Sequence, residues 1–241
     1  MTHSNIDLHC HSYVSDGSLS PTEVVERAAE KGVSLLALTD HDTIAGQKEA
    51  MTRAETLDID MVSGIELSCV WRHFTIHILG LNFSLDDGVM LEAQKIQTEA
   101  RKQRAVIITE RLVKKGLPDL YEQAKSLSQS GIAGRPHFAQ AMIDAGVVAN
   151  HGEAFKKYLG AGKIGDVKSM WPELSVVTSW IKAANGSAVI AHPRKYNMTL
   201  TKLRELIHEF KSFGGEGIEV ITSGQKQGEV GMLSDLCQRL D

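Results

Sequence analysis

The chain has 241 residues, enough for one sizeable domain or for a domain that carries an insertion. Its hydrophobic content of 42% and charged content of 23% are ordinary for a soluble globular protein. The net charge of −4 excludes a generally basic surface, so any site for a polyanion must be a local feature. Ten histidines against four tyrosines indicate metal or acid–base chemistry.

The three cysteines, Cys10, Cys69 and Cys237, are odd in number and far apart in the sequence. A disulfide framework is therefore not expected, and a reducing compartment fits. The N-terminal residues show no basic region followed by an apolar run, and no stretch reaches the roughly 18 apolar residues of a membrane span. We expect a soluble cytoplasmic protein without a targeting segment and without a membrane partner.

Strand and helix patterns alternate over the first third of the chain. The first helix has clear bounds, because Ser20 is a good N-cap, Glu23 stands at the capping-box position and Gly32 closes it. The apolar run that follows is typical of a strand buried in a parallel sheet. The expected elements are strand 5–11, helix 20–32, strand 33–39, helix 43–57, strand 58–67 and strand 74–81.

The pattern changes at about residue 84. Residues 86–115 form one long helical segment, and residues 119–165 stay helical or looped without a clear strand, which indicates a helical insertion. Alternation then resumes. The remaining expected elements are helix 173–184, strand 187–193, helix 199–213, strand 217–222 and helix 226–240.

These repeated strand–helix units favour a parallel α/β architecture, of which a barrel is the common closed form. We expect the barrel to consist of residues 1–84 and 171–241, and the helical insertion domain to cover residues 85–170. The sequence stops on a helix where a further strand would follow, so we expect the barrel to be incomplete there, with an unpaired sheet edge.

The first strand carries two histidines with unusual spacing. His9 and His11 project from the same face of a strand, whereas Cys10 points the other way. Asp16 lies in the loop beyond the carboxyl end of this strand, the end at which active sites form in barrels and parallel sheets. Two hydrogen-bonded core histidines are the simpler interpretation of this motif, and it stays open on these residues alone.

Four more expected strands repeat this arrangement. The side chains concerned are His41 between Asp40 and Asp42, Glu66, His77 and His192. Five strands that each place an imidazole or a carboxylate at one rim are poorly explained by core packing, because buried charge is costly unless it is paired or bound to metal. Mixed imidazole and carboxylate ligands suit Zn, Mn or Fe, and the absence of thiolates argues against a structural zinc site.

The motifs HCH followed by Asp16, TDHD, GIE, HILG and AHP, in this order, resemble the PHP (polymerase and histidinol phosphatase) superfamily of metal-dependent phosphoesterases. The resemblance covers residues 5–82 and 186–222. The segments YVSDGSLSPTE, GRPHFA and AHPRKY are most similar to the bacterial 3′,5′-nucleoside bisphosphate phosphatases, a branch that includes 5′→3′ exoribonucleases. The resemblance implies a distorted (β/α)7 barrel with a small helical insertion and up to three divalent ions, with manganese expected and Mg, Zn or Fe as alternatives.

The resemblance also implies roles for individual residues. It assigns His9, His11 and Glu66 to the first ion, Asp16 and His41 to the second, and a bridging Glu66 with His77 and His192 to the third. The family completes the first two sites with a late G-S-D-x-H motif. Here Asp235 is followed by Leu236 and Cys237, so we expect each of these two sites to lack one ligand, or the sequence to be truncated at Asp241.

Such a cluster is suited to hydrolysis of phosphate esters, with a metal-bound hydroxide as the attacking group and Glu66 as the bridging ligand. Neither a G-x-S-x-G elbow nor a P-loop is present. A second phosphate on the substrate would need cationic partners, and Arg135, His137 and Arg194 are the candidates. For Arg135 and Arg194, a structural or solvated role is the open alternative.

The predicted function is therefore removal of the 3′-phosphate from 3′,5′-bisphosphonucleotides, and trimming of single-stranded RNA from its 5′ end is the second expected activity. The basic side chains of segment 86–115 could follow an RNA backbone, although a solvated helix explains them more simply. Two alternatives remain open: a histidinol-phosphate phosphatase, and a PHP module that binds metal without catalysis. No obligate protein partner is inferred.

Overall fold

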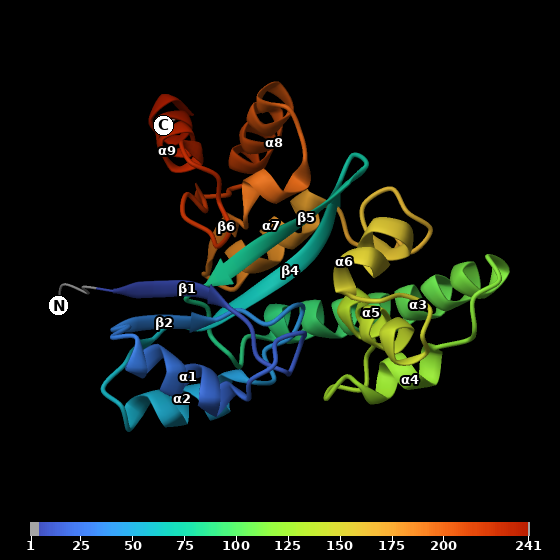
Figure 1. Cartoon of the computed structure of the whole chain (residues 1–241). Coiled ribbons are helices and arrows are strands. Elements are labelled where there is room, and N and C mark those ends of the chain that lie inside the picture. Colours follow the sequence, from blue (N-terminus) through green and yellow to red (C-terminus); the bar gives the residue numbers. More distant parts are fainter. Residues whose placement is uncertain (1–4, 241) are drawn as a thin grey trace.

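The computed structural model describes residues 5–240 and places their strands in two sheets (Figure 1). Residues 1–4 and Asp241 lie outside the described residues. Residues 1–4 belong to the N-terminal segment in which no targeting signal is expected. The first sheet is parallel and has the order β1 (Ile6–Cys10), β2 (Leu35–Leu38), β3 (Asp60–Met61). The second has the order β4 (Gly64–Trp71), β5 (Phe74–Leu81), β6 (Ser187–Ile190), β7 (Gly217–Ile218).

Two helices cover the first sheet, α1 (Pro21–Glu30) and α2 (Gln47–Glu55), and both lie on one side of β1 and β2 (Figure 1). Helix α1 begins as the sequence predicts, because the Ser20 side chain accepts from the Glu23 amide while the Glu23 carboxylate accepts from the Ser20 amide. Their apolar faces form a small core with the strands, made by Val24, Val25, Ala28, Leu36, Leu38, Ala50, Ala54 and Ile59.

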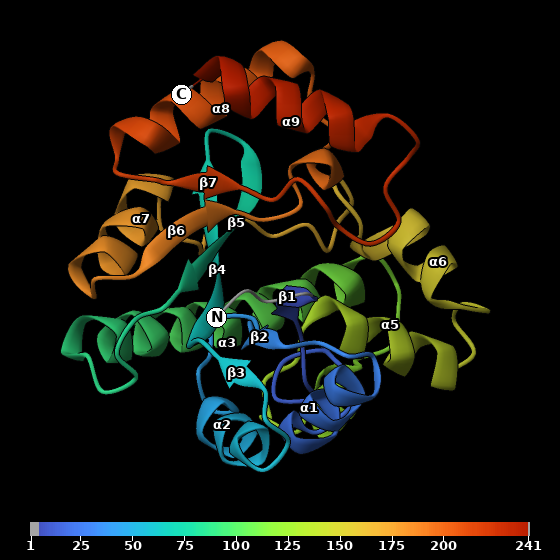
Figure 2. The same cartoon turned by 90° about the vertical axis from the view of Figure 1, so that its left-hand side faces the viewer.

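The second sheet packs against α7 (Leu174–Ala183), α8 (Leu200–Ser212) and α9 (Glu229–Leu240), which gather at the opposite end of the molecule from α1 and α2 (Figure 2). Alternate residues of β4 and β5, such as Ile65 and Ile76, are fully buried against these helices. This leaves the other face of β4 and β5 free to carry polar side chains toward the first sheet.

Helices fill the chain between β5 and α7, and no strand lies there in the described structure. They are α3 (Gly88–Lys114), α4 (Tyr121–Ser126), α5 (Arg135–Asp144), α6 (His151–Ala154) and the π-helical η1 (Phe155–Leu159). They have a core of their own, with Phe138 and Met142 fully buried in it. The first turns of α3 belong to the main core instead, through Met90 and Ala93.

The structure corrects three expectations about the strands. Strand β5 is antiparallel to both β4 and β6, so the second sheet is mixed rather than parallel. Only Arg72 and His73 separate β4 from β5, and so short a connection permits only an antiparallel pair. The expected strand 58–67 is divided into β3 and β4, and the expected strand 217–222 is reduced to the two residues of β7.

The α/β class is confirmed, while the closed seven-stranded barrel stays a prediction. In residues 5–240 the two sheets meet through a single parallel bridge between His41 and Glu66. Across this bridge the Asp42 amide donates to the Glu66 carbonyl, and the Glu66 amide donates to the Asp40 carbonyl. None of the helices described between residues 5 and 240 has the length and apolar character that crossing a bilayer requires.

Candidate metal centre

In the part of the chain that the structure describes, five histidines surround the carboxylate of Glu66, whose side chain is only 1% exposed. The five come from β1, from the loops after β1, β2 and β6, and from the middle of β5. The distances to Glu66 Oε2 are 3.4 Å from His9 Nε2, 3.2 Å from His11 Nε2 and 3.0 Å from His41 Nδ1. Those to Oε1 are 3.0 Å from His77 Nδ1 and 2.9 Å from His192 Nε2.

The alternation of a strand brings the first two histidines together, as expected. His9 Nε2 and His11 Nε2 are 3.2 Å apart, whereas the Cys10 thiol turns away and contacts the Ala37 carbonyl. The loop after β1 then carries Asp16 back toward the site. Its turn requires Gly17, because a Cβ there would lie 2.4 Å from the His11 carbonyl oxygen.

Asp16 joins the site at its open side. Its carboxylate oxygens lie 3.8 Å from His11 Nδ1 and 3.7 Å from His41 Nε2, and its side chain is 28% exposed. Burial alone would raise the pKa of Asp16, but the neighbouring charges of His41 and His11 outweigh burial and lower it. Asp16 therefore adds an ionised carboxylate at the edge of the histidine group.

Glu66 lies at a different position on its strand from the one that the sequence predicts. It is the third residue of β4 and therefore lies near the start of that strand, not at its carboxyl end as expected. The backbone bridge to His41 holds this part of β4 against the end of β2. His77 likewise lies inside β5, opposite Ser68, so it reaches the site from the face of the sheet and not from a rim.

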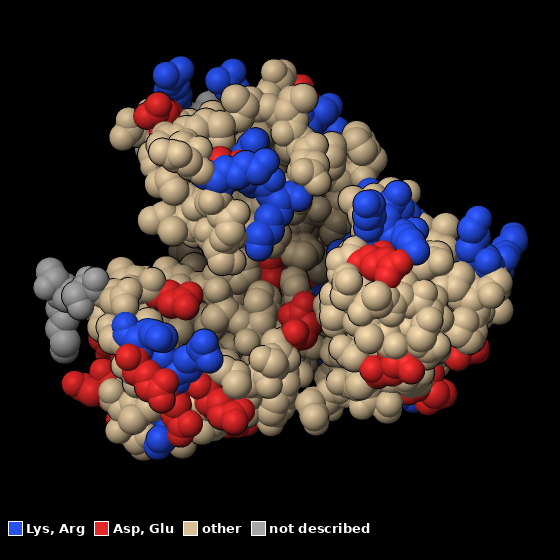
Figure 3. All heavy atoms as spheres, in the orientation of Figure 1, with Lys and Arg blue, Asp and Glu red and all other residues tan. Residues whose placement is uncertain are grey.

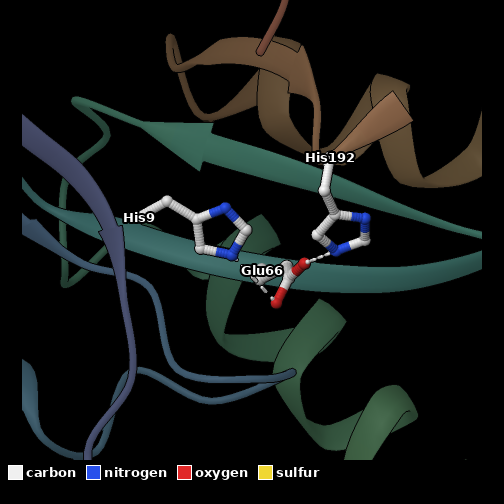
Figure 4. A group of neighbouring side chains, drawn as sticks. All are labelled: His9, Glu66 and His192. Atoms are coloured by element: carbon white, nitrogen blue, oxygen red, sulfur yellow. Dashed lines mark hydrogen bonds and ion pairs between the residues drawn. The ribbon is translucent and has the colours of Figure 1, made fainter. Parts of the chain in front are cut away.

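His192 follows β6 and has a backbone φ of 30°, a left-handed conformation that is strained for a residue with a side chain. The turn is held on its far side, because the Tyr196 hydroxyl donates to the Ala191 carbonyl at 2.7 Å. In Figure 4 the rings of His9 and His192 approach Glu66 from opposite sides. The hydrogen bond from Tyr196 therefore helps to hold the strained backbone of His192 at the point where its ring enters the site.

Protonation in this group follows from burial and from neighbouring charges. Burial alone would raise the pKa of Glu66, but the charges of His41 and His77 outweigh it and hold the pKa well below its usual range. Burial lowers the pKa of His77 to about 4. His9 differs: burial alone would lower its pKa, but the hydrogen bond to Glu219 and the nearby charge of Glu66 outweigh burial and raise it to about 10.

The donor atoms fit a divalent cation. His41 Nδ1 and Glu66 Oε2 are buried without a hydrogen-bond partner, although they lie 3.0 Å apart. Lone pairs that face one another in this way fit a shared cation better than a hydrogen bond. Among residues 5–240, three groups have ligand atoms within 4.8 Å of one another: His9–Glu66–His192, His11–Asp16–His41 and His41–Glu66–His77.

The two aspartates that flank His41 do not point into these groups. Asp40 accepts hydrogen bonds from the Ser12 amide, the Ser12 hydroxyl and the Ser15 hydroxyl, and it thereby holds the loop that carries Asp16. Asp42 accepts from the Ser68 amide and hydroxyl and from Arg101 Nε at 2.6 Å. Asp40 is therefore held by neutral donors, whereas the charge of Asp42 is paired with that of Arg101.

A cavity of about 810 Å³ opens from the histidine group between the two sheets. Its inner end is lined by His9, His11, His41, His77 and His192, and its walls by apolar side chains of β1, β5 and β6. Figure 3 shows the surface hollowed in this region, with acidic groups inside the hollow and basic groups on its rim. The site is thus open to a ligand of considerable size.

The three expected substrate residues lie in different surroundings. His137 lines a smaller cavity of about 50 Å³ together with His41 and Arg101. Arg135 donates to the Leu159 carbonyl, and its pKa is lowered, chiefly by burial. Arg194 forms an ion pair with Glu229 at the start of α9.

Two residues near the site escaped the sequence analysis. Arg101 is one of many charges on the long helix, and its contact with Asp42 depends on a packing that no local pattern reveals. Glu219, in the last predicted strand, accepts from His9 Nδ1 at 2.8 Å. A carboxylate on a sixth expected strand, after five strands that each carry an imidazole or a carboxylate, was the signal available for Glu219.

Comparison with known proteins places this geometry in a class. Residues 7–81 match the family model of the PHP domain. The chain is 44% identical over 98% of its length to a 5′-3′ exoribonuclease of Haemophilus influenzae, covering 85% of that protein. It is 40% identical over 90% of its length to a 3′,5′-nucleoside bisphosphate phosphatase of Chromobacterium violaceum, covering 76% of that protein.

A solved structure agrees. An amidohydrolase from Chromobacterium violaceum, determined with bound sulfate and no metal, superimposes with a TM-score of 0.92 at 37% identity, covering 98% of this chain and 84% of that one. Fold and site thus define a hydrolase of phosphate esters built on a PHP domain. The chain belongs to the PHP family, which confirms the resemblance drawn from its motifs.

Proposed function

We propose that this protein is a metal-dependent phosphoesterase that releases the 3′-phosphate of 3′,5′-bisphosphonucleotides. The observation that carries the proposal is the sharing of Glu66 by two of the three candidate ligand groups, in a cavity open to a large ligand. A carboxylate shared in this way suits adjacent cations, and paired cations suit displacement at phosphorus. The named activity of the bisphosphate phosphatase relative supports the same substrate class.

The proposed ligands are His9, His11, Asp16, His41, Glu66, His77 and His192. The geometry favours a different grouping from the one implied by the resemblance: His11 stands with Asp16 and His41, and His9 stands with Glu66 and His192. His77 stands with Glu66 and His41. When bound, divalent ions supply an activated water and neutralise phosphate charge. Glu66, with its lowered pKa, remains an anion near neutral pH and needs no proton to bind them.

The second phosphate of the substrate is proposed to bind beside the insertion. Arg101 and His137 line the small cavity next to His41. Burial, together with repulsion from Arg135 and Arg101, lowers the pKa of Arg104 to about 9, so three guanidinium groups lie close together. An anion would relieve this repulsion. Arg194 is the weaker candidate, because it does not line this small cavity and pairs with Glu229 instead.

The test is phosphate release from adenosine 3′,5′-bisphosphate after chelation and again after manganese is restored. We expect release only with the metal. Release that survives complete chelation would contradict the proposal. Bound manganese without turnover would favour a module that binds metal without catalysis. Histidinol phosphate is the comparison substrate, and faster release from it would favour that alternative activity.

Action on RNA is the second candidate function, supported by the named activity of the Haemophilus relative. The cavity, with a volume of about 810 Å³, is large enough for more than one phosphate-bearing group. The experiment uses single-stranded RNA labelled at its 3′ end, so that removal of nucleotides from the 5′ end shortens the labelled product stepwise. A labelled strand that stays intact while the bisphosphonucleotide is hydrolysed would limit the function to small substrates.

A further inference from the structure

Glu219 is a nearly buried carboxylate that contacts the histidine group from outside. It follows β7, and its side chain is 13% exposed. Oε1 lies 2.8 Å from His9 Nδ1, and Oε2 accepts from the backbone amide of His192 at 2.5 Å. Neither contact uses the ring atoms of His9 and His192 that face Glu66, which are the Nε2 atoms.

The contact with His9 determines which ring nitrogen carries the proton. A carboxylate oxygen is only an acceptor, so neutral His9 must hold its proton on Nδ1 to donate to Glu219. Its Nε2 is then left as a lone pair, directed at Glu66 Oε2 and at His11 Nε2. Histidines that bind metals commonly donate their other nitrogen to a carboxylate in this way.

The contact with His192 acts on the backbone. His192 stands in a left-handed conformation, and the hydrogen bond from its amide to Glu219 holds this turn. Glu219 is itself anchored, because its own amide donates to the Ile190 carbonyl at 2.9 Å. The position of the His192 ring is therefore tied to the register of β6 and β7.

Glu219 also spans the two sheets. Strand β1, which carries His9, belongs to the first sheet, whereas β6 and β7 belong to the second, and no pairing joins β1 to β7 among the described strands. One side chain thus connects residues that the backbone hydrogen bonds leave separate. The positions of His9 and His192, the two histidines grouped with Glu66, therefore both depend on Glu219.

We infer that Glu219 is a positioning residue of the metal centre, which fixes the Nδ1-protonated form of His9 and the turn of His192. The inference rests on the proposed function only in assuming that this group holds a cation. A direct role as a ligand is disfavoured, because both oxygens of Glu219 are already committed to hydrogen bonds. The expected consequence is a preformed site of higher affinity.

The variants are Glu219→Ala and Glu219→Gln, with Glu216→Gln as the matched control. Glu216 lies three residues earlier, is exposed and pairs with Lys182, away from the histidine group. Manganese binding is followed by isothermal titration calorimetry. We expect Glu219→Ala to weaken one site by roughly 10- to 100-fold, Glu219→Gln to weaken it less, and the control to match the unchanged protein.

A second readout does not need metal or activity. Long-range ¹H–¹⁵N spectra of the metal-free protein report whether each ring nitrogen carries a proton, and we expect His9 Nδ1 to lose its uniform protonation in Glu219→Ala. Unchanged affinity together with unchanged protonation of His9 Nδ1 would overturn the inference. Complete loss of one ion in both variants, with the protonation of His9 Nδ1 retained, would make Glu219 a ligand and would overturn it as well.

The two proposals fail separately. If the unchanged protein binds manganese but hydrolyses no phosphate ester, the proposed function fails while the calorimetric comparison still tests Glu219. If Glu219→Ala does not fold, as far-UV circular dichroism would show, the Glu219→Gln variant keeps both measurements available, because its amide can still accept from His9 but cannot satisfy both contacts as a carboxylate does.

Discussion

The chemistry of this protein concentrates on one carboxylate. Glu66 is 1% exposed and has five imidazoles within 3.4 Å, so its removal would leave several buried ring nitrogens without their common partner. The cost of such unpaired groups depends on their protonation, and neutral histidines tolerate it best. Function is therefore more sensitive than folding to the loss of Glu66.

Replacing Glu66 by Ala should lower manganese-dependent phosphate release by more than about 100-fold, because the residue is shared by two candidate ligand groups. The far-UV circular dichroism should stay close to that of the unchanged protein. Phosphate release and metal content are measured on the same preparation. Turnover near the normal rate would show that Glu66 is not a shared ligand.

Stability of the metal-free protein should depend on pH through His9. Its folded pKa of about 10 lies above the ordinary histidine value of 6.5, so its contribution is complete below pH 6.5 and is lost as the pH rises toward 10. Urea unfolding after chelation, measured from pH 6.5 to 10, should show this fall. Glu219→Gln should flatten it, since the hydrogen bond to Glu219 is the largest raising influence. An equal fall in both proteins would contradict the assignment.

At the scale of the elements, Asp42 joins strands and a helix around the site. Asp42 connects the end of β2 with β4, through Ser68, and with α3, through Arg101. Because its carboxylate is fully buried and its φ is 57°, its geometry is restricted by the chain on both sides. The orientation of Arg101 toward the small cavity is thus determined by a contact between elements.

Asp42→Asn should raise the KM for the bisphosphonucleotide by about tenfold with a smaller change in kcat, because it removes a charged partner of Arg101 and not a ligand. Arg101→Ala should have a similar effect, and the double variant should be little worse than either single one. Lys102→Ala, an exposed neighbour on α3, is the control. Additive losses would show that the two residues act independently.

Arg135 and Arg194, two candidate phosphate contacts on separate elements, are expected to affect KM differently when each is replaced by alanine. Arg135→Ala should raise KM by about tenfold, because it removes one of three neighbouring guanidinium groups on the side of the insertion. Arg194→Ala should leave KM nearly unchanged, since Glu229 already pairs with it. Steady-state kinetics of both variants decide between them. The reverse pattern would move the substrate phosphate to the side of β6 and α9.

For the molecule as a whole, the centre lies where the two sheets meet, and in residues 5–240 a single backbone bridge joins the sheets there. Cations bound there should stabilise the fold, since they bind the folded arrangement of residues that are far apart in the unfolded chain. At a manganese concentration 100 times its dissociation constant, each site should add about 2.7 kcal/mol, or roughly 5–10 °C in Tm. Scanning calorimetry with chelator and with manganese measures this. Equal Tm values would contradict a preformed site.

Much of this centre was predictable because its signals are local. The alternation of a strand places His9 and His11 on one face, and a polar residue in an apolar run is conspicuous at His41, His77 and His192. The central position of Glu66 was not predictable in the same way. It results from the backbone bridge to His41, which joins elements distant in sequence.

The amino-acid sequence alone was sufficient for the family, the α/β class and the set of residues that gather at the site, since these depend on motifs and on short periodic patterns. The antiparallel β5, the grouping of His11 with Asp16 and His41, and the contacts of Glu219 and Arg101 emerged only from the folded chain. Each of these depends on packing between segments far apart in sequence, where spacing along the chain carries no information about distance in space.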